Sequence, residues 1–373
     1  MKRILLIILA LALLTGCAQT PVGQVVKEDT IKIGFIGPLS GELASWGENE
    51  RLGIELALKE INDAGGINGK KIEVIYEDGK CEPKAAATAA QKLINIDKVK
   101  AIIGETCSSA TLAAAPIAEK NKVILISPVS GADSISQAGD FIFRNFITNN
   151  AYAVKGAKII EQELGSKRVA VLYINNDAGV STKDKFIEHF NGDIVSVEGY
   201  APDTRDFRTL LLKVKQTNPD LIYLSGYWPD GGLILKQAKE LNIETQFFGS
   251  NDAYDTPELL EIAGDSADSF IILSAIAHAG PRYDDFENKF KQAYEKEPPI
   301  FSEYAYDLAN ILTLAIKEKG YDSEGIRDYL YDLEDYQGAS NVINFDENGD
   351  LEHSAMLMKI VEDDEFKNLK VII

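Results

Sequence analysis

The chain has 373 residues, of which 45% are hydrophobic and 26% charged, a composition typical of a globular protein that is long enough for two domains. Its formal net charge of −20 would repel nucleic acid and anionic lipid surfaces, so we expect neither as a partner.

The N-terminus has the pattern of an export signal. A short basic start, 1–3, precedes eleven apolar residues, 4–14, which are too few to span a bilayer comfortably. The Leu-Thr-Gly-Cys ending at Cys17 resembles a lipoprotein processing site; ordinary cleavage nearby, with Cys17 lost or incidental, is the alternative. We therefore expect a signal peptide over 1–16 and a lipid-anchored tether over 17–30. The rest should lie outside the cytoplasm, held at the cell membrane in a periplasm or on the outer face.

From residue 31 onward, short apolar runs alternate with longer amphipathic ones. The first series predicts strands at 31–37, 71–78, 99–104 and 122–127, and its clearest helix starts near Trp46 and stops at a Gly-Gly pair. The second series predicts strands at 168–174, 193–200, 220–227, 245–250 and 270–276, and helices near 180–191, 206–217, 230–241, 284–296 and 302–319. A final hairpin is predicted from 342–350 and 353–366 with an Asn-Gly turn.

This alternation indicates an α/β fold of two doubly wound lobes, each with a parallel sheet covered on both faces. Ligands bind such sheets at the carboxyl ends of the strands, so the expected site is the cleft between the lobes.

The cysteines of the folded part are Cys81 and Cys107, and a disulfide is the default in an exported domain. A catalytic thiol would need a histidine partner and a metal site would need more ligands, yet none of the three histidines is near Cys107 in sequence. A Gly-x-Ser-x-Gly elbow and a Lys-Ser or Lys-Thr phosphate loop are both missing from the sequence. We expect no enzyme, no metal and no cofactor.

Hydroxyl groups gather where the strand 99–104 turns into a helix. Ser108 and Ser109 stand at that helix start, whose free amides and positive dipole end suit a carboxylate. Serine at this place is equally typical of an N-cap that serves only the helix. Trp46, at the start of the first helix, is open to the same two interpretations: it either walls a pocket or packs into the core.

An ordered set of motifs along the chain resembles that of a known protein family. The motifs are IGPLSG, ASWGENERLGIELALKEINDAGGINGKKIEVIYED, CEPKAAATAAQKLI, IIGETCSSAT and ISPVSG, continued by FIFRNF, AVLYINNDAG, PDLIYLSGYWPDGGLILKQAKEL, TQFFGS and IAGDSADS. Together they resemble the extracytoplasmic solute-binding proteins of branched-chain amino acid ABC transporters, over essentially the whole chain after residue 30.

The resemblance implies two Rossmann-like lobes, joined by a three-strand hinge, that close on the ligand. It assigns 31–148 and 276–350 to the first lobe, and 149–275 and 351–373 to the second. It also implies a disulfide between the two cysteines named above, a monomer, and delivery of an amino acid to an ABC transporter permease.

The resemblance further implies roles for single residues. Ser108 matches a serine that holds the ligand α-carboxylate, and Trp46 matches an aromatic wall of the side-chain pocket. Val129 matches a residue whose backbone carbonyl accepts from the α-ammonium group. Tyr227 matches a tyrosine of the second lobe that closes over the ligand.

Three positions depart from the family pattern. A threonine that usually helps to bind the carboxylate aligns with Gly131, so its backbone amide or the neighbouring Ser130 would have to substitute. A common aromatic residue is Ala178, which enlarges the second-lobe side of the pocket. The acid that pairs with the ammonium aligns with Asn251 or Asp252, and we favour Asp252. These departures leave open another small amide or carboxylate as ligand, such as a short amide, urea or an aromatic acid, or a ligand-sensing receptor subunit.

Overall fold

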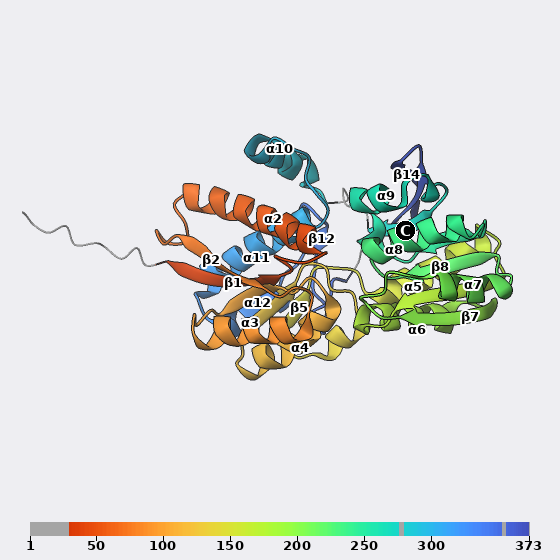
Figure 1. Ribbon diagram of the computed structural model, residues 1–373. Helices are drawn as coiled ribbons and strands as arrows, with labels where there is room; N and C mark the ends of the chain where they lie inside the picture. Colours follow the sequence, from red (N-terminus) through yellow and green to blue (C-terminus); the bar gives the residue numbers. More distant parts are fainter. Residues whose placement is uncertain (1–29, 276–279, 353–355, 373) are drawn as a thin grey trace, which may run out of the picture.

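Two lobes lie side by side in the computed structural model, which describes residues 30–275, 280–352 and 356–372 (Figure 1). Each lobe is built on its own sheet, and a small two-stranded sheet, β11 (Tyr336–Gln337) with β12 (Val342–Ile343), accompanies the first lobe. The predicted signal peptide and nearly all of the predicted tether lie outside the described residues. Among the residues that are described, none of the helices is both long and apolar enough to cross a bilayer.

The first lobe has a five-stranded parallel sheet. Its strand order is β2 (Ile72–Asp78), β1 (Ile31–Gly37), β3 (Ala101–Gly104), β4 (Ile124–Ser127) and β5 (Ile142–Arg144). Side chains alternate along β1: Ile33 and Phe35 pack on one face, and Ile36 packs on the other. Both faces are buried, as parallel sheets require.

Helices from distant parts of the sequence cover this sheet. One face carries α2 (Ala44–Asp63) and α11 (Ser302–Lys319), which pack on each other, with α10 (Tyr283–Tyr294) and α12 (Ser323–Tyr331) beside them. The other face carries α3 (Pro83–Asn95) and α4 (Ser108–Lys120). The helix α2 ends before Gly65 and Gly66, whose φ of 101° and 70° favour glycine. Figure 1 shows the blue C-terminal helices lying among the orange N-terminal ones.

The second lobe has a seven-stranded sheet. Its order is β14 (Glu365–Ile372), β13 (Met356–Glu362), β10 (Ile271–Ala275), β9 (Gln246–Gly249), β8 (Leu221–Ser225), β6 (Arg168–Ile174) and β7 (Asp193–Tyr200). The strands from β10 to β7 are parallel, and β13 and β14 are added antiparallel. The helices α5 (Asn149–Gln162) and α6 (Asp177–His189) cover one face; α7 (Arg208–Gln216), α8 (Trp228–Glu240) and α9 (Pro257–Ala263) cover the other.

The chain passes between the two sheets three times, as the expected hinge requires. The first crossing follows β5 through residues 145–148. The second crossing comes after β10 and the third comes before β13. Residues 276–279 and 353–355 lie outside the described residues. A buried ion pair ties the first crossing to the C-terminal part of the chain, since Arg144 Nε lies 2.7 Å from Asp350 Oδ1.

The predicted terminal hairpin is wrong. The segment 342–350 contributes β12, which pairs with β11, and its Asn-Gly turn closes only a single bridge. The segment 353–366 supplies β13, which pairs with β10 and with β14. The turn of that real hairpin is at Asp363 and Asp364, whose φ values of 54° and 60° fit a type I′ turn. The apolar run of β13 is buried because it joins the sheet of the second lobe.

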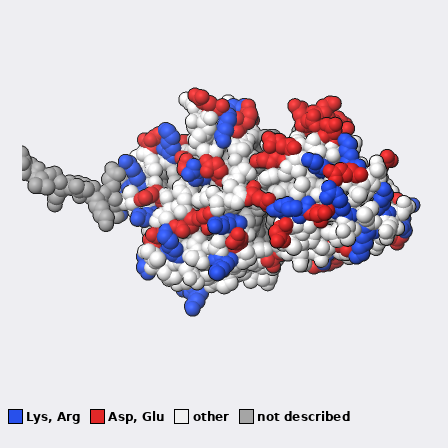
Figure 2. Space-filling view, in the orientation of Figure 1, with Lys and Arg blue, Asp and Glu red and all other residues white. Residues whose placement is uncertain are grey.

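Charges of both signs are interspersed over the face of the molecule in Figure 2. The densest acidic group on this face lies at the turn between β13 and β14, where Glu362 to Glu365 are exposed. Such a run of like charges is typical of a solvated surface turn.

Candidate functional site

A small cavity of about 40 Å³ lies where the carboxyl ends of the strands of the two lobes face each other. Eight of the ten ligand-binding candidates line it: Trp46, Ser108, Val129, Gly131, Ala178, Tyr227, Asn251 and Asp252. The remaining two, Ser109 and Ser130, do not. Sequence reasoning missed five further lining residues with side chains or backbone toward the cavity: Thr106, Phe146, Asn149, Ala253 and Phe301.

Hydrogen-bond donors from the start of α4 line the cavity. The helix α4 begins at Ser108, as predicted, and its first intrahelical amides are those of Ala110 and Thr111, both bonded to the carbonyl of Cys107. The amides of Ser108 and Ser109 therefore precede the helical ladder. The Ser108 hydroxyl oxygen accepts from the Ala132 amide at 3.1 Å, which leaves its proton free to donate. Such an end attracts an anion.

The predicted disulfide holds this helix start. Cys107, the N-cap of α4, is bonded to Cys81 in the loop after β2. Cys107 also donates its amide to the buried Glu105 carboxylate at 2.8 Å. The same three side chains come close enough to surround an ion, but both sulfurs are used in the disulfide, so no thiolate remains to bind a metal.

Ser130 is buried behind the cavity. Its hydroxyl lies 2.7 Å from the Thr111 hydroxyl and donates to the Glu105 carbonyl at 2.9 Å. The hydroxyl therefore ties the turn after β4 to the strand β3 and is not directed at a ligand. Of the two substitutes expected for the missing threonine, only the backbone of Gly131 lies at the cavity.

A buried carboxylate lies among the residues of the second lobe that line the cavity. Asp252 is 4% exposed, and its Oδ1 accepts from the Tyr152 hydroxyl at 2.8 Å. Burial raises the pKa of Asp252 to about 7, because a desolvated carboxylate is costly and the Tyr152 hydrogen bond offsets only part of that cost. Asn251 has a different role: its Oδ1 accepts from the Ala253 amide at 3.0 Å and caps a short turn.

Aromatic rings form the apolar wall. Trp46 is 3% exposed and makes edge-to-face contacts with Tyr227 and Phe301, with ring centroids 5.4 and 5.5 Å apart. Phe146 continues the wall next to Phe301, at 6.2 Å. Trp46 therefore belongs to the core and to the cavity at once, so its two interpretations are compatible. Nothing in the local sequence marks Phe301, which precedes α11 with a left-handed φ of 75°.

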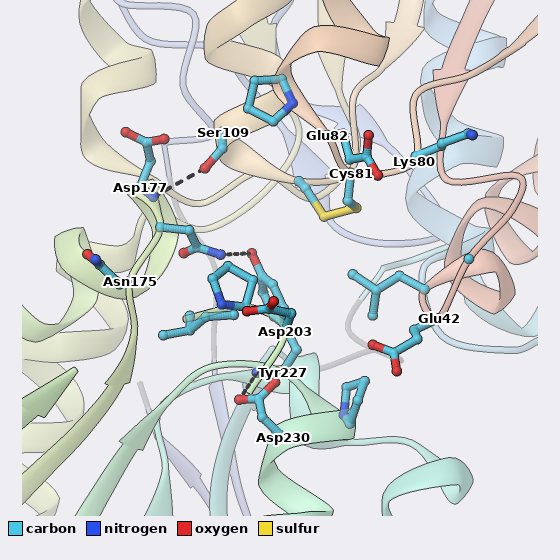
Figure 3. Close-up of a pocket in the computed structure, with 18 of the residues that line it drawn as sticks. Glu42, Lys80, Cys81, Glu82, Ser109, Asn175, Asp177, Asp203, Tyr227 and Asp230 are labelled. Carbon is cyan, nitrogen blue, oxygen red and sulfur yellow. Dashed lines mark hydrogen bonds between the residues drawn. A yellow bond between two sulfur atoms is a disulfide. The ribbon is translucent and has the colours of Figure 1, made fainter. Parts of the chain in front are cut away.

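A larger cavity of about 730 Å³ adjoins the small one, and Tyr227 lines both (Figure 3). The Tyr227 hydroxyl accepts from Asn176 Nδ2 at 3.2 Å, and its amide donates to Asp230 at 3.1 Å. Ser109 lines this larger cavity, where its hydroxyl accepts from the Asp177 amide at 3.2 Å. Ser109 thus joins the two lobes across the cleft.

Two more contacts between the lobes flank the site. The Ser181 hydroxyl donates to Asp133 at 2.7 Å, and Arg205 forms an exposed ion pair with Glu42 at 2.6 Å. With the Ser109 contact, these bonds hold the lobes together around the small cavity, so the structure has the closed arrangement.

Acids buried close to the cavity have a structural role. Glu50 is fully buried and accepts from the Thr106 hydroxyl at 2.9 Å, and burial raises its pKa well above the usual range. Burial also raises the pKa of Glu105 to about 8. Burial therefore favours the protonated form of both carboxyls, and both position the segment that carries Thr106 and Cys107.

A two-lobed α/β protein that closes on a small, polar-ended, aromatic-walled cavity is a solute-binding protein. Residues 30–365 match the periplasmic binding protein family, and this chain belongs to that family. Residues 1–18 match the prokaryotic membrane lipoprotein lipid attachment site, which includes Cys17. The protein is therefore extracytoplasmic and anchored to a membrane through lipid.

Relatives with known ligands cover nearly the whole chain. A leucine-, isoleucine-, valine-, threonine- and alanine-binding protein of Pseudomonas aeruginosa is 31% identical over 87% of this chain and 88% of its own length. A leucine-specific-binding protein of Salmonella typhimurium is 31% identical over 92% of this chain and 94% of its own. A Streptococcus pneumoniae branched-chain amino acid transporter substrate-binding protein, solved with isoleucine, is 30% identical with a TM-score of 0.85 over 92% of this chain and 99% of that one. These relatives are binding proteins.

Proposed function

We propose that this lipoprotein captures an amino acid with an apolar side chain, branched or otherwise hydrophobic, between its lobes and delivers it to the permease of an ABC importer. It does so as a monomer, without chemistry and without a cofactor. One observation carries the proposal: a single cavity is lined by free donors, a buried carboxylate and aromatic rings.

The two polar ends match a zwitterion. The start of α4 and the Ser108 hydroxyl offer donors to an α-carboxylate. Asp252 offers a negative charge to an α-ammonium, and the Val129 carbonyl lines the same cavity. Because an unpaired buried carboxylate is costly, a cationic ligand group lowers the free energy of the closed form more than a neutral group would.

The apolar wall matches a hydrophobic side chain. Trp46, Phe146 and Phe301 are each no more than 5% exposed, so a side chain that contacts them is fully removed from water. Burial of a leucine-sized side chain contributes about 1.5–3 kcal/mol. The sequences of relatives that bind leucine, isoleucine and valine support the same class of ligand.

The competing ligands are another small amide or carboxylate, motivated by Gly131 and Ala178. A short amide, urea or an aromatic acid brings no cation to Asp252 and leaves that carboxylate buried without a counter-charge. The amino acid is therefore favoured. A ligand-sensing receptor subunit would bind in the same way and differ only in its partner.

Calorimetry on ligand-stripped protein tests the ligand class. We expect binding of leucine, isoleucine or valine, and weaker binding of urea and of benzoate. Mass spectrometry of the ligand released from natively purified protein gives an independent result. Recovery of an amide or an aromatic acid, with no heat from any aliphatic amino acid, would refute the proposal.

Transport tests the partner. Cells that lack this protein should lose uptake of the same radiolabelled amino acid, and the Ser108→Ala variant should fail to restore it. Normal uptake without the protein, alongside tight binding in solution, would favour the sensing role.

A further inference from the structure

We infer that the side-chain oxygen of Asn149 is a selectivity-determining acceptor for the ammonium group of the ligand, in the space that a side chain at Gly131 would otherwise fill. The inference rests on the proposed function. It assigns a ligand contact to a residue that the sequence did not single out.

Asn149 and Gly131 exclude each other's side chains. A Cβ atom added to Gly131 would lie 2.2 Å from Asn149 Oδ1 and 3.1 Å from its Cγ, closer than van der Waals contact permits. The backbones are also joined, since the Asn149 amide donates to the Gly131 carbonyl at 2.7 Å. The carboxamide oxygen thus stands where a threonine at position 131 would place its side chain.

The orientation of the carboxamide follows from its other partner. Asn149 Nδ2 donates to the Ala178 carbonyl at 3.0 Å. A flipped amide would bring two oxygens together at that contact, so Oδ1 is the atom beside Gly131. Asn149 is 4% exposed and lines the small cavity, and Oδ1 receives no hydrogen bond from the described part of the protein.

An oxygen in this position accepts hydrogen bonds and cannot donate them. It lines the same cavity as the Asp252 carboxylate and the Val129 carbonyl, so three acceptors are available to a ligand there. Three acceptors fit an ammonium, which has three donors, and repel a carboxylate or a carbonyl oxygen. The donors of α4 remain for the opposite end of the ligand.

Two departures from the family pattern are therefore linked. The missing side chain at Gly131 admits the Asn149 carboxamide, and the backbone of Ala178 fixes its orientation. Instead of a hydroxyl that would help to bind the carboxylate, position 131 therefore faces an acceptor oxygen from the start of α5 in the second lobe, which can bind only a donor group.

The first experiment measures the dissociation constant of Asn149→Ala by calorimetry for the amino acid that the wild type binds and for its α-hydroxy analogue. Loss of a hydrogen bond to a charged group should weaken amino acid binding about 10- to 100-fold. The analogue has no charged donor, so the ratio of the two dissociation constants should fall about tenfold. Asn150→Ala, the next residue of α5 and outside the cavity, is the matched control and should bind like the wild type.

The second experiment places a threonine hydroxyl at position 131 and removes the Asn149 carboxamide. Gly131→Thr alone should bind poorly because its Cβ meets the carboxamide, whereas the double variant Gly131→Thr/Asn149→Ala should recover most of the loss of either single variant. Gly131→Ala displaces the carboxamide without removing it and should therefore also weaken binding. It tests the same contact if Asn149→Ala is poorly folded. Melting temperatures check the fold of each variant.

The outcomes separate the two proposals. If the wild type binds no amino acid, the proposed function fails. If the wild type binds an amino acid, two results would refute the role of Asn149 without affecting the proposed function. One is an Asn149→Ala variant with unchanged affinity and unchanged amine-to-hydroxyl selectivity. The other is a double variant at 131 and 149 whose loss of binding free energy equals the sum of the two single losses.

Discussion

Replacement of Asp252 by asparagine should stabilise the ligand-free protein and weaken its ligand. The Asp252 side chain is buried with one donor, Tyr152, at 2.8 Å, and burial raises its pKa to about 7 from 3.8. Asparagine keeps an oxygen for Tyr152 and removes the charge. The folded protein therefore no longer bears the cost of a buried carboxylate, and the ligand loses its counter-ion.

The magnitude depends on pH with a definite sign. Between pH 4 and 7 the folded carboxyl of Asp252 holds a proton that the unfolded one has lost, so folding stability falls as the pH rises through this range and levels off above pH 7. At 1.36 kcal/mol per pKa unit, the full effect is about 4 kcal/mol. The variant should thus match the wild type near pH 4 and exceed its unfolding free energy by about 4 kcal/mol at pH 8.

Ligand binding should change in the opposite direction. Removal of one partner of a buried charge pair costs about 2 kcal/mol or more, so the dissociation constant should rise at least about 30-fold at pH 8. Wild-type affinity should fall about tenfold per pH unit below pH 7, as Asp252 takes up its proton, while the affinity of the variant should not change.

Urea unfolding of ligand-free protein and calorimetry, each from pH 4 to 8, measure both effects. The control is Ser134→Ala. Ser134 is exposed and lies outside the small cavity, so this variant should change neither the unfolding free energy nor the affinity. An Asp252→Asn variant that is less stable than the wild type at pH 8, or that binds with unchanged affinity, would refute the assignment of Asp252 as a desolvated counter-ion.

Three further predictions concern the frame of the site. Loss of the disulfide in Cys81→Ser/Cys107→Ser, which closes a loop with a sequence separation of 26, should lower the unfolding free energy by about 3.5 kcal/mol in urea titrations; equal midpoints with and without reductant would contradict this. Arg144→Ala leaves Asp350 buried without its cation and should cost about 3–5 kcal/mol in the same assay, whereas a cost below 1 kcal/mol would show that the pair is dispensable. Trp46→Ala removes a ring that packs in the core and at the cavity, so calorimetry should find affinity reduced at least about tenfold; unchanged affinity would exclude it from the ligand wall.

Local patterns were sufficient for most of the fold. Alternating apolar runs placed most strands of both sheets but not β5 or β14, and the helix start at Ser108 followed from serines after a buried strand. The terminal hairpin failed because an Asn-Gly pair favours a tight turn without determining how many residues pair on either side. Two consecutive aspartates form the real turn, and β13 is drawn into the second sheet by partners far away in sequence.

The cavity was harder to predict for the same reason. Phe301 is distant in sequence from Phe146 and Asn149, and no local spacing marks the three as neighbours. Asn149 has the sequence pattern of an ordinary residue at a helix start, and its relation to Gly131 depends on a close approach that only the folded chain creates. Likewise, nothing in the local sequence around Ser130 indicates that its hydroxyl bonds to the backbone carbonyl of Glu105 and is therefore not directed at a ligand.

The contacts that join the lobes around the cavity have a kinetic consequence. A ligand enclosed behind Tyr227, the Ser109 contact and the Glu42–Arg205 pair leaves only after the lobes separate. Its residence time is then limited by how often the lobes open, a rate to which these contacts contribute together with those of the ligand itself. Residues that never touch the ligand thereby set how long the protein retains its load.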